Sequence, residues 1–162
     1  MFYLDLFRAL NDHQVRYLLV GGLAMNLHGV PRMTMDVDLV LAMDEDNLDR
    51  FIGCARALDL SPVAPVPLAA LKDAEQRRQW AEQKHMIAFA LQPASTGGPT
   101  VDILIRPVID IAAALLRGEA RHLNDVAVSV AAIEDMITLK SAAGRQQDED
   151  DIAHLERLRG PG

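Results

Sequence analysis

The sequence lacks the features that mark secreted or membrane-spanning chains. It contains one cysteine, Cys54, so no disulfide can form within the chain, which fits a reducing compartment. No apolar run approaches the roughly 18 residues of a membrane span. The opening residues, "MFYLDLFRALNDHQVR", include the acidic Asp5 and no small-residue cleavage site, unlike a signal peptide. We therefore expect a cytoplasmic protein with no membrane segment.

The sequence also has no excess of basic residues. The formal net charge is −7. Contacts with phosphates supply most of the affinity of general nucleic-acid binders, so an acidic chain fits that class poorly. Nucleotide chemistry is not excluded, because a local basic patch or metal ions in an acidic cleft can hold a polyphosphate.

Apolar residues are abundant. Half of the 162 residues are apolar, which is enough for a core without disulfides or a structural metal. Charged residues make up 24%, and this balance argues against disorder. The length corresponds to one domain, so we expect residues 1–162 to form a single domain.

The spacing of apolar residues predicts helices mixed with strands. Helices are expected at residues 2–12, 22–29, 44–60, 68–83, 108–118, 133–144 and 148–158. Strands are expected at residues 15–20, 35–43, 84–92, 100–107 and 122–131. The proline-rich segment 61–67 is expected to be a turn or loop, and "PASTGGP" to close a hairpin. This pattern predicts an α+β protein with a mixed sheet flanked by helices and a helical C-terminus.

Two aspartates stand one residue apart in the expected strand 35–43. Side chains at alternate positions of a strand share a face, which places Asp36 and Asp38 roughly 7 Å apart at Cα. Two carboxylates at that distance repel by roughly 2 kcal/mol at an effective dielectric constant of about 20. A solvated strand face would tolerate this repulsion, whereas a bound divalent cation would reverse it. We interpret the pair as a candidate metal site.

Two glycines stand between the strand expected at 15–20 and the helix that follows. Gly21 and Gly22 have no Cβ, so the backbone there can approach a ligand closely. The amides at the start of a helix bind phosphate, although the glycines also suit a plain tight turn. A phosphate cradle beside a metal-binding strand predicts a nucleoside triphosphate site.

The stretch "GGLAMNLHGVPRMTMDVDLVL" resembles the signature of the DNA-polymerase-β-like nucleotidyltransferase superfamily. Arg32 and Thr34, which precede the aspartate pair, make it more similar to the AbiEii-type branch of bacterial abortive-infection and toxin–antitoxin systems. The resemblance covers most of the chain. It implies a nucleotidyltransferase fold, Mg²⁺ or Mn²⁺ as cofactor, and a nucleoside triphosphate as substrate.

The family also has a third carboxylate on a neighbouring strand, and "TVDILI" supplies Asp102 in that setting. Val101, Ile103 and Ile105 assign the opposite face of this strand to the core, so Asp102 points away from the core. Three roles remain open for Asp102. It could be an exposed residue of an edge strand, share a metal with Asp36 and Asp38, or act as general base.

The resemblance further implies a nucleotide-binding role for Gly21, Gly22, Arg32, Thr34 and Lys140. From the residues alone, Arg32 and Thr34 equally suit a solvated loop, and Lys140 suits a helix surface.

After Lys140 comes "AAGRQQDEDDI", in which Gln147 stands where many relatives have lysine. Asp148 and Asp151 suit the acidic first turn of the last helix, or could orient Lys140 or Arg145.

The remaining candidates favour ordinary structural roles. None of the five histidines has a partner at zinc spacing, and all five are expected to be surface or cleft residues. Trp80 is expected to anchor its helix in the core rather than to stack on a base.

The resemblance implies transfer of a nucleoside monophosphate from an NTP to an acceptor hydroxyl. It further implies a toxin-side enzyme with a cognate antitoxin as partner, and with tRNA or protein as acceptor. One alternative is a nucleotide-binding partner or antitoxin-like protein of the same fold with little or no turnover. The other is a nucleotidyltransferase that acts on a small molecule such as an antibiotic.

Overall fold

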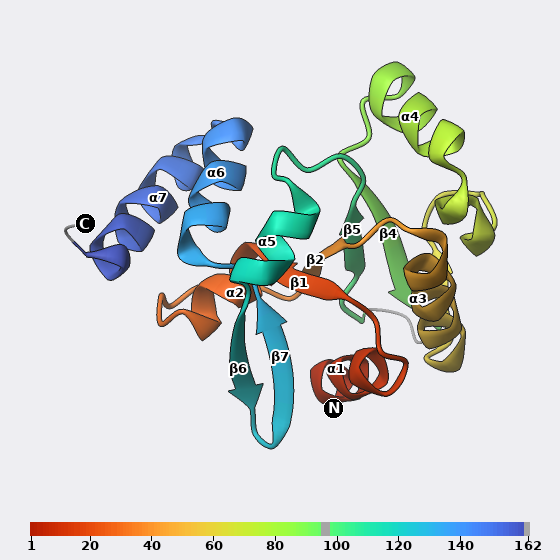
Figure 1. Cartoon of the computed structure of the whole chain (residues 1–162), viewed down its shortest axis with the longest axis horizontal. Helices are drawn as coiled ribbons and strands as arrows, with labels where there is room; N and C mark the ends of the chain where they lie inside the picture. Colours follow the sequence, from red (N-terminus) through yellow and green to blue (C-terminus); the bar gives the residue numbers. More distant parts are fainter. Residues whose placement is uncertain (95–97, 161–162) are drawn as a thin grey trace.

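A computed structural model describes residues 1–94 and 98–160 of the chain (Figure 1). Its helices are α1 (Phe2–Asp12), α2 (Gly21–Leu27), α3 (Glu45–Ala57), α4 (Ala74–Gln83), α5 (Ile111–Arg117), α6 (Ile133–Ala143) and α7 (Gln146–Arg159), with a 3₁₀ turn η1 (Leu68–Lys72). Its strands are β1 (Tyr17–Val20), β2 (Val37–Leu41), β3 (Leu60–Pro62), β4 (Ala88–Pro93), β5 (Val101–Leu104), β6 (Glu119–Leu123) and β7 (Val126–Val130). No helix in these ranges is long and apolar enough to cross a membrane.

The strands form one mixed sheet in the order β3-β4-β5-β2-β1-β7-β6. β2 lies at its centre, antiparallel to β1 and parallel to β5. β4 and β5 are antiparallel neighbours, which confirms the predicted hairpin, although residues 95–97 of its loop lie outside the described residues. The predicted mixed sheet flanked by helices, with a helical C-terminus, is confirmed. The single-domain assignment stays a prediction.

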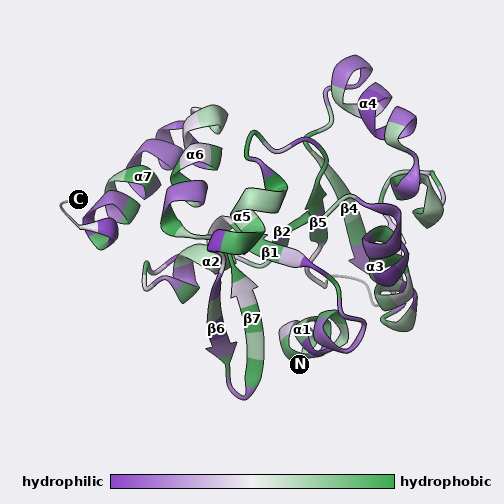
Figure 2. Cartoon of the chain, in the orientation of Figure 1, coloured by the Kyte–Doolittle hydropathy of each residue, from purple (hydrophilic) through white to green (hydrophobic). Residues whose placement is uncertain are grey.

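The core explains why the central strands are so apolar. Each residue of β1 is buried, and so is each residue of β2 except Asp38. Strands covered on both faces read as continuous apolar runs, as they do here. Trp80 is 2% exposed and stacks on Phe89 of β4, with ring centroids 5.1 Å apart. Trp80 is the one buried side chain of the otherwise hydrophilic α4 (Figure 2), so its predicted anchoring role is confirmed.

Two predicted elements divide where a residue at the boundary imposes a break. The helix expected over 68–83 is split at Asp73, whose carboxylate caps α4 by accepting from the amides of Glu75 and Gln76. The single strand expected over 122–131 is instead a hairpin of β6 and β7. Asn124 makes its tight turn possible with a φ of 53°, a conformation that asparagine tolerates better than most residues.

Two buried polar residues tie elements together. The side chain of Asn47 accepts from the amide of Arg16 and donates to the carbonyls of Arg16 and Ala42, which fastens α3 to the ends of β1 and β2. His28 was expected at the surface or in a cleft, and that expectation is wrong. Its ring is buried and Nε2 lies 2.8 Å from the carbonyl oxygen of Ala131, so Nε2 donates.

Candidate nucleotidyltransferase site

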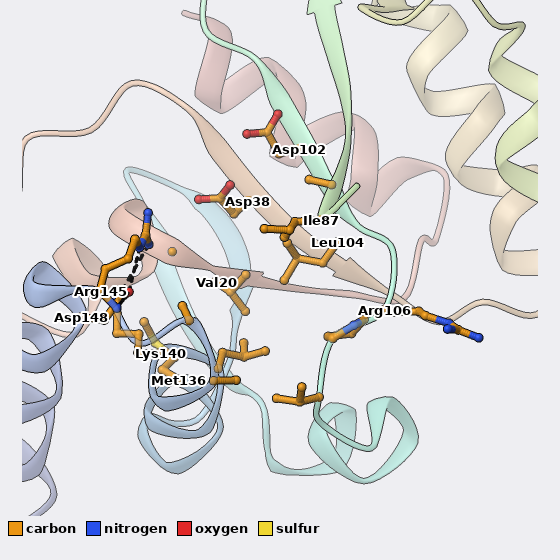
Figure 3. Close-up of a pocket in the computed structure, with 17 residues that line it drawn as sticks. Val20, Asp38, Ile87, Asp102, Leu104, Arg106, Met136, Lys140, Arg145 and Asp148 are labelled. Atoms are coloured by element: carbon orange, nitrogen blue, oxygen red, sulfur yellow. Dashed lines mark hydrogen bonds and ion pairs between the residues drawn. The ribbon is translucent and has the colours of Figure 1, made fainter. Parts of the chain in front are cut away.

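Asp38 and Asp102 lie side by side on neighbouring strands at the centre of the sheet. They are register partners on the parallel strands β2 and β5. Figure 3 shows their carboxylates on the same side of the sheet. Val37, Leu39, Val101 and Ile103 alternate with them and are fully buried on the core side. The alternation of each strand therefore brings together two carboxylates that are 64 positions apart in sequence.

Neighbouring negative charge raises the cost of ionising both Asp38 and Asp102, although Lys140 partly offsets this for Asp38. Burial, then the charges of Asp102 and Asp36, raise the pKa of Asp38 to about 6. Burial and the charge of Asp36 also raise the pKa of Asp102, although a hydrogen bond from Thr100 opposes this. A positive ligand placed between these carboxylates would relieve both effects.

Gly21 provides the space that the Asp38 carboxylate occupies. Its φ is +74°, and a Cβ at this position would lie 2.0 Å from Asp38 Oδ2. A Cβ on Gly22 would in turn lie 2.9 Å from the Cβ of Thr34. The glycine pair therefore allows both the sharp turn from β1 into α2 and the close approach of the strand and loop that follow.

Asp36 lies outside the strand in which it was expected. β2 begins at Val37, whose amide donates to the carbonyl of Thr100 at 2.9 Å, and Asp36 is exposed in the preceding loop. Its Oδ1 accepts from the amide of Thr100 at 3.2 Å. The prediction that β2 includes Asp36 is wrong, because pairing with β5 starts one residue later.

Basic side chains approach the site from the C-terminal helices and from the loop before β2. Lys140 of α6 is buried and donates to Asp151 Oδ2 at 2.8 Å. Arg32, from the loop before β2, forms an ion pair with the same carboxylate. Burial alone would raise the pKa of Asp151, but the hydrogen bonds from Lys140 and Arg32 outweigh it and lower that pKa.

A second ion pair lies beside the first. Arg145 donates to Asp148 at 2.8 Å and 3.2 Å. Its hydrogen bonds hold the pKa of Asp148 below the usual range. Asp148 and Asp151 thus orient the basic side chains of this region, which is one of the two roles that the sequence had left open for them.

One pocket of about 590 Å³ joins the acidic and basic parts of the site (Figure 3). Gly21, Asp38 and Asp102 line one side, and Lys140, Arg145 and Asp148 line another. Arg106, which pairs with Glu82, also lines it, and the rest is an apolar wall: Val20, Ile87, Ala88, Leu104, Pro107, Val108, Met136, Leu139, Ala142 and Ala143. The pocket can accommodate a charged group between carboxylates and cations, with apolar surface beside it.

The sequence matches a known protein family over most of its length. The pattern of the family described as "Nucleotidyl transferase AbiEii toxin, Type IV TA system" matches residues 4–152. The chain belongs to the AbiEii family. None of the curated proteins compared with it matches its sequence.

Solved structures agree at the level of the fold. This AbiEii-family chain is similar to an antigenic nucleotidyltransferase-like protein from Paracoccidioides brasiliensis, with a TM-score of 0.59 and 22% identity over 97% of this chain and 74% of that one. It also matches ANT(2″)-Ia in complex with adenylyl-2″-tobramycin, with a TM-score of 0.49 and 13% identity over 97% and 95% of the two chains. The first likeness supports a nucleotidyltransferase-like fold.

The predicted site residues divide into two groups in the AbiEii-family structure. Gly21, Asp38, Asp102 and Lys140 line the pocket. Gly22, Arg32, Thr34 and Asp36 lie outside the pocket lining. Gly22 packs against Thr34, Arg32 pairs with Asp151, and Asp36 accepts from the amide of Thr100. Thr100 and the apolar wall were missed, because neither has a local sequence signal apart from the position of Thr100 two residues before Asp102.

The carboxylate pair suits a hard divalent cation in chemistry and position. Within residues 1–94 and 98–160, no group of three or more His, Cys, Asp or Glu side chains is placed to hold a metal ion, so Asp36 is not grouped with Asp38 and Asp102 as the predicted trio required. Mg²⁺ is commonly held by one or two carboxylates, with water and substrate phosphates as the remaining ligands. Asp38 and Asp102 therefore fit as the protein's share of such a site.

Proposed function

We propose that this protein transfers a nucleoside monophosphate from an NTP to an acceptor hydroxyl in a reaction that depends on Mg²⁺ or Mn²⁺. One observation carries the proposal. Asp38 and Asp102 are register partners that face a pocket whose other side carries Lys140 and Arg145. Carboxylates for a cation and ammonium or guanidinium groups for phosphate are the components that nucleotidyl transfer needs.

In the proposed reaction, the acceptor oxygen bonds to the α-phosphorus as the bond from that phosphorus to the bridging oxygen breaks, and pyrophosphate leaves. When bound, the divalent cation would neutralise phosphate charge and make the phosphorus more electrophilic. We assign Asp38 and Asp102 to hold it, with Asp36 as a further acidic group beside them. One of the carboxylates takes the proton of the acceptor hydroxyl, and we assign this task to Asp102.

We assign the nucleotide to the glycine turn and the basic side of the pocket. Gly21 makes room for the Asp38 carboxylate beside the turn, and Gly22 packs against Thr34. We assign Lys140, a buried cation that lines the pocket, to bind the triphosphate. Arg32 supports Lys140 through their common partner Asp151.

The family description leads us to propose a toxin-side enzyme whose activity a cognate antitoxin restrains. We propose RNA, with tRNA as the first acceptor to test, and protein as the second. The alternatives, a nucleotide-binding protein without turnover and an enzyme that acts on a small molecule, are separated by the same experiment.

The test is to incubate the protein with each labelled NTP and Mg²⁺ or Mn²⁺ in the presence of tRNA, of protein or of an aminoglycoside. We expect label on a macromolecule, pyrophosphate release, and loss of both in Asp38→Asn and Asp102→Asn. Asp150→Asn is the matched control, because Asp150 is exposed. Nucleotide binding without transfer to any acceptor would favour the non-enzymatic alternative. Transfer to the aminoglycoside alone would favour the small-molecule alternative.

A further inference from the structure

Thr100 contacts the acidic site through all three of its polar groups. Its amide donates to Asp36 Oδ1 at 3.2 Å, and its carbonyl accepts from the amide of Val37 at 2.9 Å. Its hydroxyl donates to Asp102 Oδ1 at 3.1 Å. Thr100 directly precedes β5, so one residue links the start of β2 to the carboxylate on the neighbouring strand.

The hydroxyl and the backbone of Thr100 act on different carboxylates. The backbone groups hold Asp36 and the start of β2 whatever side chain is present. The hydroxyl reaches only Asp102, where it donates to Oδ1. Groups that hydrogen-bond a metal-binding carboxylate orient it and commonly change metal affinity by 10- to 100-fold.

We infer that Thr100 is a positioning residue, whose hydroxyl orients Asp102 for divalent-cation binding beside Asp38. The inference rests on the proposed function, because it assumes that these two carboxylates share a cation. The inference goes beyond the proposed function because it assigns a role to Thr100, which lies outside the pocket lining and would not touch the substrate. Thr100 acts through the rotamer of Asp102 alone.

The chain allows a matched pair of substitutions. Thr100→Val keeps the branched shape and the backbone contacts but removes the hydroxyl, and Thr100→Ser keeps the hydroxyl but removes the methyl group. Mn²⁺ binding is measured from the electron paramagnetic resonance signal of free Mn²⁺, with and without a non-hydrolysable NTP. We expect the Mn²⁺ dissociation constant of Thr100→Val to be 10- to 100-fold larger than that of wild type. The dissociation constant of Thr100→Ser should stay within about 3-fold of wild type.

Turnover provides a second readout that a merely structural role would not reproduce. We expect the Mn²⁺ concentration at half-maximal activity to rise in Thr100→Val, while saturating Mn²⁺ restores most of kcat. If Thr100→Val does not fold, Thr100→Ala removes the same hydroxyl with less demand on packing. Unchanged Mn²⁺ affinity in the folded hydroxyl-free variant would overturn the inference, and so would equal losses in the valine and serine variants.

Failure of the inference and failure of the proposed function give different results. Wild-type protein that binds Mn²⁺ but transfers no nucleotide contradicts the proposed function, and a selective loss of Mn²⁺ affinity in Thr100→Val still supports the positioning role. Wild-type protein that binds no Mn²⁺, with or without nucleotide, contradicts both. Normal transfer together with unaltered Mn²⁺ affinity in Thr100→Val contradicts the positioning role alone.

Discussion

Gly21 lies directly against the carboxylate of Asp38, since a Cβ at position 21 would stand 2.0 Å from Asp38 Oδ2. The glycine that follows β1 is therefore a condition for the position of the aspartate on β2. The two residues are 17 positions apart in sequence and meet because β1 and β2 are antiparallel neighbours, with Val20 opposite Asp38.

Gly21→Ala is expected to displace the Asp38 carboxylate and to lower both stability and Mn²⁺ affinity. A left-handed φ costs a non-glycine residue roughly 1–2 kcal/mol, and the steric overlap adds to that cost. Gly144→Ala is the control, because Gly144 has a similar φ of +67° and nothing within 4 Å of its Cβ position. Urea unfolding measures the difference. Equal destabilisation of the two variants would mean that the contact with Asp38 is unimportant.

Asp38→Asn is expected to stabilise the metal-free protein at neutral pH. The folded state raises the pKa of Asp38 to about 6, mainly by burial, so the stability of the folded state falls as pH rises from about 4 to about 6, and the full cost is present above 6. The asparagine side chain does not ionise, so the variant avoids a loss of folding free energy of at most about 3 kcal/mol.

The measurement for Asp38→Asn is the free energy of unfolding in the presence of chelator at pH 7.5 and at pH 4. The advantage of the variant should be large at pH 7.5 and small at pH 4. Added Mg²⁺ should raise the melting temperature of wild type more than that of the variant. An advantage that does not depend on pH would contradict the assigned cause.

Asp151→Asn is expected to destabilise the protein by about 2–4 kcal/mol at pH 7, because it leaves Lys140 and Arg32 without their common carboxylate. The folded state lowers the pKa of Asp151, so its contribution is present above the unfolded value of about 3.9 and is lost as pH falls below it. The difference from wild type should therefore shrink toward pH 3. Asp150→Asn, on the exposed side of α7, should show no such dependence.

Lys140→Met is expected to weaken binding of a non-hydrolysable NTP by roughly 10- to 100-fold, because a hydrogen bond to a charged group contributes about 1.5–3 kcal/mol. Lys84→Met, at an exposed position, is the control for loss of charge. Isothermal titration in the presence of Mg²⁺ measures both. Equal effects of the two substitutions would show that Lys140 acts through net charge rather than through contact.

Much of this protein could be predicted from the sequence because the relevant signals are local. Apolar spacing predicted most of the elements from α1 to α7, but it missed β3, joined η1 to α4, and merged β6 and β7 into one strand. The buried neighbours Val101 and Ile103 correctly placed Asp102 on the face away from the core. The glycine pair at the junction of β1 and α2 predicted a close approach to a ligand, which stays a prediction; the structure shows Gly21 against the carboxylate of Asp38.

The remaining features depend on contacts between segments that are far apart in sequence. Local spacing predicted a strand through Asp36, but the start of β2 depends on where Thr100 pairs with it. His28 was expected at the surface or in a cleft, but its ring is buried and Nε2 donates to the carbonyl of Ala131, 103 positions away in sequence.

The sequence by itself determined which residues could carry the chemistry: the carboxylates, the glycines and the lysine of the family pattern. Only the tertiary structure decided which of them meet. The parallel register of β2 and β5 places Asp38 beside Asp102, and the packing of α7 on α6 gives Lys140 the partner that it shares with Arg32. Side-chain alternation and apolar spacing are properties of a short segment, whereas a register or an ion pair across 119 positions exists only once the chain has folded.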